Sequence, residues 1–381
     1  MLAIGIMTGT SLDGIDIALC DIEGVDDSTK IKFLYGKTFP YPSDVLLEIQ
    51  KAVHNQAIVS DIAYLNFRLA EVYSHSVKKL INETNYSMND IQFISSHGQT
   101  VYHQGKSDDK KRSSTLQLGS GAVLAELAQT TVITNFREHD MAQGGQGAPL
   151  IPFVDKVLFY DKNKNRIIQN IGGISNISLI TKKDEVIAFD TGPGNMLINA
   201  GMEYLYQKSF DDKGLTARKG KLIQPLFEIL INHPFYNEKP PKSCGREQFG
   251  LPYLEKIIHP FLHERKEDII HTITYATVYT MADAIKRYIY VESIDELIVS
   301  GGGVKNAFLM ELLQKLLTPI KVISSDELGV SSDFKEAIGF VILGNQVLNQ
   351  RPNTLISATG AKKQVIGGSI QYYFKGENHE I

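Results

Sequence analysis

The chain has 381 residues, of which 43% are hydrophobic and 22% are charged. This length exceeds that of one typical domain and predicts two, and the composition is that of an ordinary soluble globular protein. The formal net charge of −4 supplies no basic excess for binding nucleic acid or an anionic membrane surface.

The first part of the chain predicts alternating strands and helices. Apolar residues run together or alternate in several short stretches, which predicts strands at 4–7, 15–22, 32–39, 93–96 and 131–134. Apolar residues at helical spacing predict helices from about 43, over 60–83 and over 124–129. Ser43 or Asp44 is expected to cap the first of these helices. The charged run 106–112 is expected to form a solvated loop.

A second cycle of elements begins near Arg166. The stretch 167–180 predicts a strand, a glycine-containing turn and a second strand, which repeats the strand–turn–strand pattern at the N-terminus. From this pattern we infer an internal structural duplication, with two halves that each begin with a glycine-turned hairpin. Further elements are expected as strands at 186–189, 296–300, 321–323 and 371–374, and as helices at 196–200, 268–288, 306–317 and 335–349. Strands that alternate with helices, together with hairpins, predict an α/β fold with mixed sheets.

A carboxylate follows the predicted strand 186–189. Asp190 comes next in the chain, and Gly192 and Gly194 lie just beyond it, where another backbone or a ligand can approach closely. An acid at such a place is typical of a general base. The alternative is structural, because Asp190 or Thr191 would also satisfy free N–H groups at the start of the following helix.

The loop from Thr8 to Asp16 has a similar character. Gly9 and Gly14 allow backbone N–H groups to face an anion, and Thr10 and Ser11 add hydroxyl donors. Asp13 or Asp16 is suited to Mg²⁺, which prefers oxygen ligands. The alternative is a polar hairpin turn, since glycine, serine and aspartate are common turn residues. The loop is neither a Walker A motif nor a dinucleotide-binding fingerprint.

Two more glycine-rich segments are candidates for ligand binding. Gly301, Gly302 and Gly303 separate a predicted strand from a helix, where one glycine would suffice for the turn. The segment 143–149 follows Arg137 and Asp140 and suits recognition of hydroxyls and carboxylates, although a domain linker would have the same composition.

Histidine and cysteine give little sign of a metal centre. His97 and His103 flank a short polar stretch, and a structural role is the default for such isolated histidines. Cys20 and Cys244 form no CxxC pair. No basic residue precedes the apolar N-terminus and no apolar run approaches 18 residues, so neither a signal peptide nor a membrane span is expected. These features predict a protein of the reducing cytoplasm.

Seven segments in order along nearly the whole chain resemble the anhydro-N-acetylmuramic acid kinases. They are 5–14, 96–100, 144–150, 170–176, 189–195, 242–247 and 301–303. The combination is far more specific than any single segment. The run 106–112 departs from the family because it is longer than the family requires.

The resemblance implies the superfamily of actin, sugar kinases and heat-shock ATPases. The fold would have two ribonuclease H-like domains with mixed sheets flanked by helices and a nucleotide cleft between them. The N-terminal domain is expected at 1–134 plus about 352–381, and the C-terminal domain at 135–351. ATP and Mg²⁺ are the implied cofactors, a small amino sugar the implied substrate, and a cytoplasmic homodimer the implied assembly.

The resemblance also implies a reaction and its residues. The kinase would open the 1,6-anhydro ring of 1,6-anhydro-N-acetylmuramic acid with water and phosphorylate O6, as part of peptidoglycan recycling. Asp190 would be the catalytic base, and Asp13 the metal ligand. Nucleotide would be bound by Gly9, Thr10, Ser11, Leu12, Asp13, Gly14, Ile15, Asp16, Gly172, Gly173, Gly301, Gly302 and Gly303. Sugar would be bound by His97, Arg137, Asp140 and Glu336.

Three other functions remain open at this point. The first is another sugar or polyol kinase of the same superfamily. The second is a nucleotide-dependent chaperone-like module, for which a peptide-binding β-domain and a long helical lid would be expected. The third is a non-catalytic regulatory relative, which the intact glycine loops and Asp190 disfavour.

Overall fold

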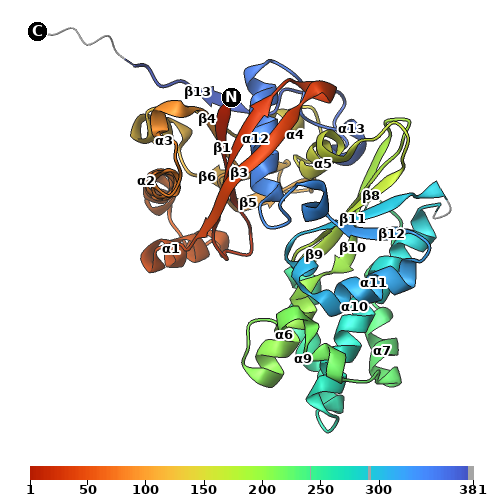
Figure 1. Ribbon diagram of the computed structural model, residues 1–381. Coiled ribbons are helices and arrows are strands. Elements are labelled where there is room, and N and C mark those ends of the chain that lie inside the picture. The colour runs from red at the N-terminus through yellow and green to blue at the C-terminus, as the bar shows by residue number, and fades with distance from the viewer. Residues whose placement is uncertain (241, 291–292, 376–381) are drawn as a thin grey trace, which may run out of the picture. The chain divides into compact units, whose positions relative to one another are not determined.

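The computed structural model describes residues 1–240, 242–290 and 293–375 (Figure 1). The chain divides into two compact units. Unit 1 is formed by Met1–Val157 and by the described part of Phe334–Ile381, and unit 2 by Leu158–Asp333. Each unit is described by itself below.

The sheet of unit 1 is mixed. Strands β1, β2 and β3 are antiparallel neighbours, and β1, β4 and β7 run parallel to one another. The full order is β13-β7-β4-β1-β2-β3. The strands are β1 (Leu2–Thr8), β2 (Ile15–Glu23), β3 (Lys30–Phe39), β4 (Ile91–Ser96), β7 (Thr131–Thr134) and β13 (Ser369–Gln371). A separate hairpin is made by β5 (Gln99–Gln104) and β6 (Ser114–Leu118).

Helices cover both faces of this sheet because neighbouring residues of a strand point to opposite sides. Ile4 and Ile6 of β1 lie in one apolar cluster with residues of α1, α2 and α3. Gly5, between them, faces α12. The helices of unit 1 are α1 (Ser43–Val53), α2 (Val59–Asn82), α3 (Gly121–Ala128), α4 (Glu138–Ala142), α5 (Ile151–Phe159), α12 (Lys335–Leu348) and α13 (Ile356–Thr359).

The sheet of unit 2 repeats this arrangement with five strands in the order β10-β9-β8-β11-β12. Strands β8, β9 and β10 are antiparallel neighbours, and β8, β11 and β12 run parallel. Its strands are β8 (Arg166–Ile171), β9 (Ile174–Ile180), β10 (Val186–Pro193), β11 (Glu296–Ser300) and β12 (Lys321–Ser324). Its helices are α6 (Asn195–Tyr206), α7 (Gln224–Ile231), α8 (Arg246–Phe249), α9 (Leu251–Ile258), α10 (Lys266–Tyr288) and α11 (Ala307–Leu317).

The two sheets confirm the predicted duplication and fold class. In each, the first strand of the unit lies at the centre, with its two hairpin partners on one side and the later parallel strands on the other. This order is that of the ribonuclease H-like fold. Each unit has its own apolar core, because burial of one face of each strand requires helices packed over it.

The domain limits expected from the sequence differ from the units that the structure shows. The expected limits lay at 134/135 and 351/352, whereas the units meet at Val157/Leu158 and Asp333/Phe334. The difference arises because α12 packs on β1 at Gly5, while Val154 of α5 contacts α12 at Gly339. Both helices therefore complete the core of unit 1.

Most predicted elements lie within a few residues of the observed ones, and two expectations, on the α1 cap and the C-terminal strand, were wrong. Helix α1 begins at Ser43, but its N-cap is Pro42, with no side-chain cap from Ser43 or Asp44. The C-terminal strand ends at Gln371 rather than beginning there. The strand 186–189 continues through a bulge between Asp190 and Gly192 and ends at Pro193. None of the helices that the structure describes is apolar for long enough to cross a membrane.

Gly5 is required by the close approach of α12 to the sheet. A Cβ atom at Gly5 would lie 1.9 Å from the carbonyl oxygen of Ala337, which is backbone and has no freedom to turn away. We expect Gly5→Ala to destabilise the protein by about 3 kcal/mol or more, which lowers Tm by about 6–12 °C. Thermal melting followed by circular dichroism measures this. The matched control is Gly9→Ala, whose new methyl group would have the Ser11 hydroxyl as its nearest neighbour, at 3.1 Å, and that side chain can turn away. Equal Tm values for the two variants would contradict the tight packing.

Candidate functional site

In unit 1, the loop that joins β1 to β2 lies at the end of a regular hairpin. Thr8 pairs with Ile15, so residues 9–14 form the turn. The carbonyl oxygen of Gly9 accepts hydrogen bonds from Leu12 N at 3.4 Å and from Gln99 Nε2 at 3.3 Å. These contacts hold the base of the loop, while Thr10, Ser11 and Asp13 are exposed. The loop therefore presents hydroxyls and one carboxylate to solvent on a fixed base.

The two acids of this hairpin differ in their surroundings. Asp13 is exposed, and its Oδ1 accepts from Ser11 Oγ at 2.7 Å. Asp16 is half-buried, and its Oδ1 accepts from Thr38 Oγ1 at 2.6 Å. Over the described residues, no group of three or more His, Cys, Asp or Glu side chains forms a ready-made metal cage. Mg²⁺ bound beside a nucleotide typically takes only one or two carboxylates and completes its shell with phosphate oxygens and waters. The donor set of this loop fits that requirement.

His97 lies behind the same loop as a neutral hydrogen-bond bridge. Its Nδ1 donates to the carbonyl oxygen of Thr8 at 3.2 Å, and its Nε2 accepts from Nε and Nη2 of Arg137 at 3.2 and 2.8 Å. Burial lowers the pKa of His97 to about 3, and the positive charge of Arg137 acts in the same direction. The imidazole is therefore uncharged near neutral pH, and it connects Arg137 to the first residue of the loop.

Arg137 is half-buried at the start of α4. Its Nη1 donates to the carbonyl oxygen of Gly147 at 2.7 Å. Burial lowers the pKa of Arg137 to about 10, opposed by the negative charge of Glu336, so the guanidinium keeps its charge. Glu336, in the first turn of α12, has a raised pKa because it is buried, and the negative charge of Asp16 adds to that effect. The structure thus brings Arg137, Glu336 and Asp16 within electrostatic reach of one another.

Asp140, which is predicted to bind sugar, forms hydrogen bonds inside unit 1. Its side chain is fully buried. Its Oδ2 accepts from Gly147 N at 2.8 Å, and its Oδ1 accepts from Thr359 Oγ1 at 2.6 Å. Through these two bonds the carboxylate supports the 143–147 segment from inside unit 1. This segment is therefore part of the architecture of unit 1 and not a linker between domains.

In unit 2, Asp190 lies at the bulge of β10. Its backbone N donates to the carbonyl oxygen of Lys242 at 3.0 Å, and its Oδ2 accepts from Cys244 N at 3.0 Å. The N-cap of the following helix α6 is Gly194, so the alternative role of Asp190 or Thr191 as that cap is excluded. Burial raises the pKa of Asp190 to about 6, although the Cys244 N–H and the positive charge of Lys242 both act to lower it. A carboxylate with this pKa exchanges a proton readily near neutral pH.

Three glycine turns gather at one end of the unit 2 sheet. Gly194 N donates to Gly173 O, and Asn195 N donates to Gly172 O, both at 2.8 Å. Asn195 Nδ2 donates to Ile171 O at 3.2 Å and lies near Gly302. The turn between β8 and β9, the start of α6 and the turn after β11 therefore meet.

The glycines of these turns fall into two groups. A Cβ at Gly194, Gly301 or Gly303 would lie 2.4–2.8 Å from its nearest neighbouring atom, so the fold itself requires glycine there. Gly301 also has φ +81°, which other residues rarely adopt. A Cβ at Gly172, Gly173 or Gly302 would meet nothing closer than 3.4 Å. Packing does not explain glycine at these three positions, but close approach of a ligand to the backbone would.

This contrast leads to a prediction for Gly173. The resemblance implies that Gly173 binds nucleotide, so we expect Gly173→Ala to weaken ATP binding by about 10-fold or more, because the new methyl group would hold the ligand away from the backbone. The stability of the ligand-free protein should stay within about 0.5 kcal/mol of wild type, because the methyl group contacts only Met196 Cε at 3.6 Å. Isothermal titration calorimetry and thermal melting check the two statements. Unchanged ATP affinity in both Gly173→Ala and Gly302→Ala would contradict the assignment.

Several residues that support the site were not identified from the sequence as functional. Gln99 and Gly147 act through hydrogen bonds to Gly9 and Arg137. Cys244 acts through its backbone N–H, which no side-chain pattern reveals. Lys242 had a usable signal, because it is a cation inside a segment shared with the kinase family.

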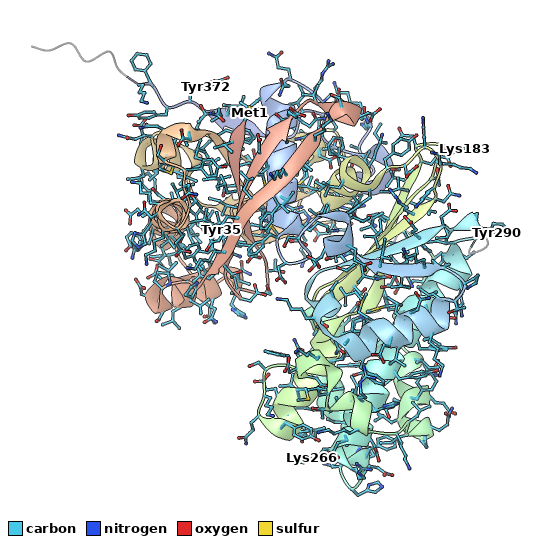
Figure 2. The ribbon with its side chains drawn as sticks, in the orientation of Figure 1. Met1, Tyr35, Lys183, Lys266, Tyr290 and Tyr372 are labelled. Atoms are coloured by element: carbon cyan, nitrogen blue, oxygen red, sulfur yellow. The ribbon has the colours of Figure 1, made fainter. Side chains whose placement is uncertain are left out.

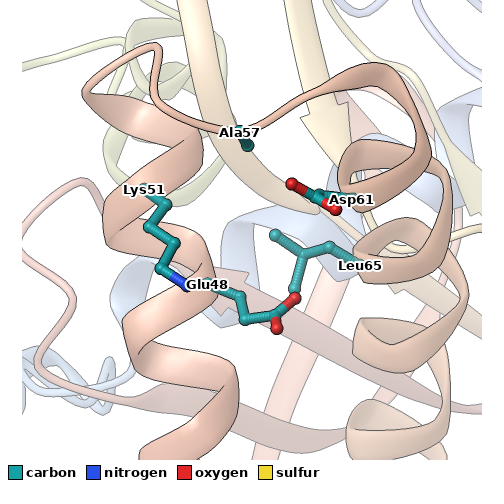
Figure 3. Close-up of a pocket in the computed structure, with 5 residues that line it drawn as sticks. All are labelled: Glu48, Lys51, Ala57, Asp61 and Leu65. Atoms are coloured by element: carbon teal, nitrogen blue, oxygen red, sulfur yellow. The ribbon is translucent and has the colours of Figure 1, made fainter.

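One pocket of unit 1 lies apart from all of these residues. It is formed between α1 and α2 and is lined by Glu48, Lys51, Ala57, Asp61 and Leu65 (Figure 3). None of its lining residues was predicted to bind nucleotide or sugar. Its open, mixed-charge wall does not indicate a particular ligand.

Comparisons with known proteins point to one family of enzymes. The family model described as anhydro-N-acetylmuramic acid kinase matches residues 1–373. A protein named anhydro-N-acetylmuramic acid kinase from Francisella tularensis subsp. novicida (strain U112) is 44% identical over 97% of this chain and 98% of its own length. One of the same name from Bacillus thuringiensis subsp. konkukian (strain 97-27) is 43% identical over 98% and 99%. Among solved structures, the activator of the 2-hydroxyisocaproyl-CoA dehydratase from Clostridium difficile with bound ADPNP aligns over 90% of this chain and 93% of its own, with 11% identity and a TM-score of 0.44.

Proposed function

The chain belongs to the anhydro-N-acetylmuramic acid kinase family, and from that premise we propose that it converts 1,6-anhydro-N-acetylmuramic acid, ATP and water into N-acetylmuramic acid 6-phosphate and ADP. The reaction would serve peptidoglycan recycling in the cytoplasm. The observation that supports this most directly is Asp190. The pKa of its carboxyl group is raised, and it lies at the bulge of β10 in the unit 2 sheet.

In the proposed reaction, Asp190 accepts a proton from the water that attacks C1. The bond between C1 and O6 breaks as the new bond between C1 and the water oxygen forms. O6 then carries the electron pair and takes the γ-phosphoryl group, and ADP leaves. A base with a pKa of about 6 is ionised at neutral pH and still has useful proton affinity, because burial and the Cys244 N–H oppose each other.

The glycine turns are proposed to bind the nucleotide. Gly172, Gly173 and Gly302 expose backbone that a phosphate or an adenine ring can approach, and the 9–14 loop offers Thr10 and Ser11 as hydroxyl donors. Asp13 would hold Mg²⁺, with Asp16 as the neighbouring acid. The ion would neutralise charge on the transferred phosphoryl group.

Arg137 is proposed to bind the lactyl carboxylate of the sugar. Two of its nitrogens donate to His97, which fixes the plane of the guanidinium. A planar fork of donors suits a carboxylate better than a flexible ammonium does. Glu336 is proposed to accept hydrogen bonds from sugar hydroxyls through its carboxyl group, whose pKa is raised by burial. His97 would then act by orienting Arg137, and Asp140 by holding the 143–147 segment.

One experiment tests the proposed reaction directly. The purified protein is incubated with ATP, Mg²⁺ and anhydro-N-acetylmuramic acid in ¹⁸O water, and the product is analysed by mass spectrometry. The expected product carries one ¹⁸O at C1 and a phosphate on O6. Parallel reactions with glucose and N-acetylglucosamine distinguish a general sugar kinase, whose products need no water. Phosphorylation without label at C1 would overturn the coupled ring opening.

The family resemblance also leads us to propose a homodimer. Size-exclusion chromatography with light scattering tests this, because a monomer of 42.4 kDa and a dimer differ twofold in mass. A single monomeric species at micromolar concentration would contradict it.

A further inference from the structure

Lys242 is a buried cation in the segment that follows the short 3₁₀ helix Pro234–Asn237. Only 7% of its surface is exposed. Over the residues that the structure describes, no carboxylate forms an ion pair with its ammonium group. Burying such a charge is unfavourable unless other groups replace water around it. The groups around Lys242 should therefore show what compensates its buried charge.

Backbone carbonyls and aromatic rings surround this ammonium group. Nζ donates to the carbonyl oxygen of Phe235 at 3.1 Å and to that of Tyr236 at 3.4 Å. Nζ also lies 4.4 Å from the ring centre of Phe235 and 5.3 Å from that of Tyr288. Carbonyl oxygens and ring faces both attract a cation, so together they replace part of the lost hydration. The side chain is thereby anchored at its tip.

The backbone of the same segment holds Asp190 at two points. The carbonyl oxygen of Lys242 accepts from Asp190 N, and two residues later Cys244 N donates to Asp190 Oδ2, both at 3.0 Å. The ring of Tyr288 contacts both the lysine and the strand. It lies near the ammonium group of Lys242, and it packs edge-on against Phe189 of β10, with 5.7 Å between the ring centres. The lysine tip, the aromatic residues and the strand that carries Asp190 thus form one packed group.

The remaining charges near Lys242 are weaker influences. Glu238 and Asp283 favour its protonated form, and Arg287 opposes it. Burial is the largest effect and lowers the pKa of Lys242. The ammonium group in turn lowers the pKa of Asp190, against the effect of burial on that carboxyl group.

We propose that Lys242 is a positioning residue for Asp190: its anchored side chain holds residues 242–244 against β10, and this segment fixes both the backbone and the carboxylate of Asp190. The inference rests on the proposed role of Asp190 as the base. It concerns Lys242 alone, because Lys242 acts through the segment and does not touch the substrate.

The test compares Lys242→Met, which keeps the volume of the side chain and removes the charge, with Lys242→Arg, which keeps the charge. Lys266→Met is the matched control, because Lys266 Nζ also donates to a carbonyl, that of Leu205 at 2.8 Å, and lies 5.5 Å from the ring centre of Tyr206. Lys266 begins α10, whereas Tyr288 ends it, and Figure 2 shows Lys266 far from Tyr290, the neighbour of that end. The two lysines therefore make similar contacts at different places in unit 2.

Two quantities are measured for each variant. The first is kcat for the anhydro sugar. The second is the titration of the Asp190 carboxyl group by ¹³C NMR of labelled aspartate, assigned by the loss of its signal in Asp190→Asn. We expect Lys242→Met to lower kcat by about 10–100-fold with little change in KM, because the base is misplaced. Its Asp190 should titrate on the order of 1 pH unit higher than in wild type, because both the cation and the fixed N–H are lost. Lys266→Met should change neither.

The outcomes separate this inference from the proposed function. Wild-type titration and kcat in Lys242→Met would overturn the positioning role, even if Asp190→Asn is inactive. The Asp190 titration could shift in Lys242→Met while Lys242→Met and Asp190→Asn both keep full turnover. That result would support the positioning role of Lys242 and overturn the proposed role of Asp190 as the base. If Lys242→Met does not fold, Lys242→Arg decides. Its larger guanidinium does not reproduce the contacts of the ammonium group, so kcat should fall, and Asp190 should titrate between wild type and Lys242→Met, because the cation is kept while the N–H is displaced; unchanged kcat would overturn the inference.

Discussion

Replacing Asp190 with asparagine is expected to lower kcat/KM for the anhydro sugar by about 10²–10⁴-fold, the usual effect of losing a general base. The substitution keeps the size of the side chain, and an amide oxygen can still accept from Cys244 N. Ring opening and phosphorylation should fall together, because O6 becomes available only when the C1–O6 bond breaks. A coupled assay for ADP, together with mass spectrometry of the sugar, measures both.

The same variant is expected to be more stable than wild type at neutral pH. The pKa of Asp190 is about 6 in the fold, against 3.8 for an ordinary aspartate. Between these values the folded protein keeps a proton that the unfolded chain has lost, so wild-type stability falls as pH rises through this window. Asparagine does not titrate, so its advantage in Tm should be largest above pH 6 and should shrink toward pH 4.

The wild-type enzyme should show the kinetic counterpart of this titration. Because only the ionised carboxylate can accept a proton, kcat/KM should decrease as pH falls through about 6. The matched control is Asp184→Asn, since Asp184 is exposed in the turn that leads into the same strand. Near-wild-type turnover of Asp190→Asn, or equal losses in both variants, would remove Asp190 from the mechanism.

Replacing Lys335 with methionine is expected to lower the free energy of unfolding by about 3–5 kcal/mol. Lys335 begins α12, and its Nζ lies 2.7 Å from Oδ1 of Asp155 on α5. The two side chains are 1% and 3% exposed. Removing the cation takes away the positive charge that compensates the buried carboxylate of Asp155. Urea denaturation followed by circular dichroism measures the change.

Two further variants decide whether the burial of this pair is the cause. The double variant Lys335→Met with Asp155→Leu removes both charges, so it should recover most of the stability that the single variant loses. Lys305→Met breaks a comparable but exposed pair with Asp333, at 2.8 Å, and should change stability by less than about 1 kcal/mol. A loss in Lys335→Met no larger than that in Lys305→Met would contradict the explanation.

The sequence predicted those parts of the fold that local pattern determines. The paired hairpins of the two units have strong turn and strand signals, and so their duplication could be inferred before any coordinates. The β5–β6 hairpin was missed, because Gln99, Thr100 and Gln117 make its strands as polar as a loop. The domain limits were misplaced because α12 contacts β1 across more than 300 residues of sequence, and no local signal reports such a contact.

The site residues also divide into those that local sequence indicated and those whose contacts only the tertiary fold determines. Asp190 and the glycine turns were found because their residue types are unusual at a strand end. Asp140 has an equally suggestive type and position, but its two oxygens are taken up by Gly147 and Thr359, which lie on different segments of unit 1. Lys242 lies in a segment that resembles the kinase family, but its contacts could not be predicted, because the carbonyls and rings around its ammonium group are brought together only by the tertiary fold.

The discontinuity of unit 1 has a consequence for how this protein is made. Translation delivers all of unit 2, Leu158–Asp333, before it delivers the helix that covers Gly5 and the edge strand that pairs with β7. At about 5–20 residues per second, a newborn chain would wait on the order of ten seconds or more with one face of its first sheet uncovered. Unit 2 can therefore fold on the ribosome before unit 1 is complete. The uncovered apolar face of the unit 1 sheet is where a nascent-chain chaperone would bind.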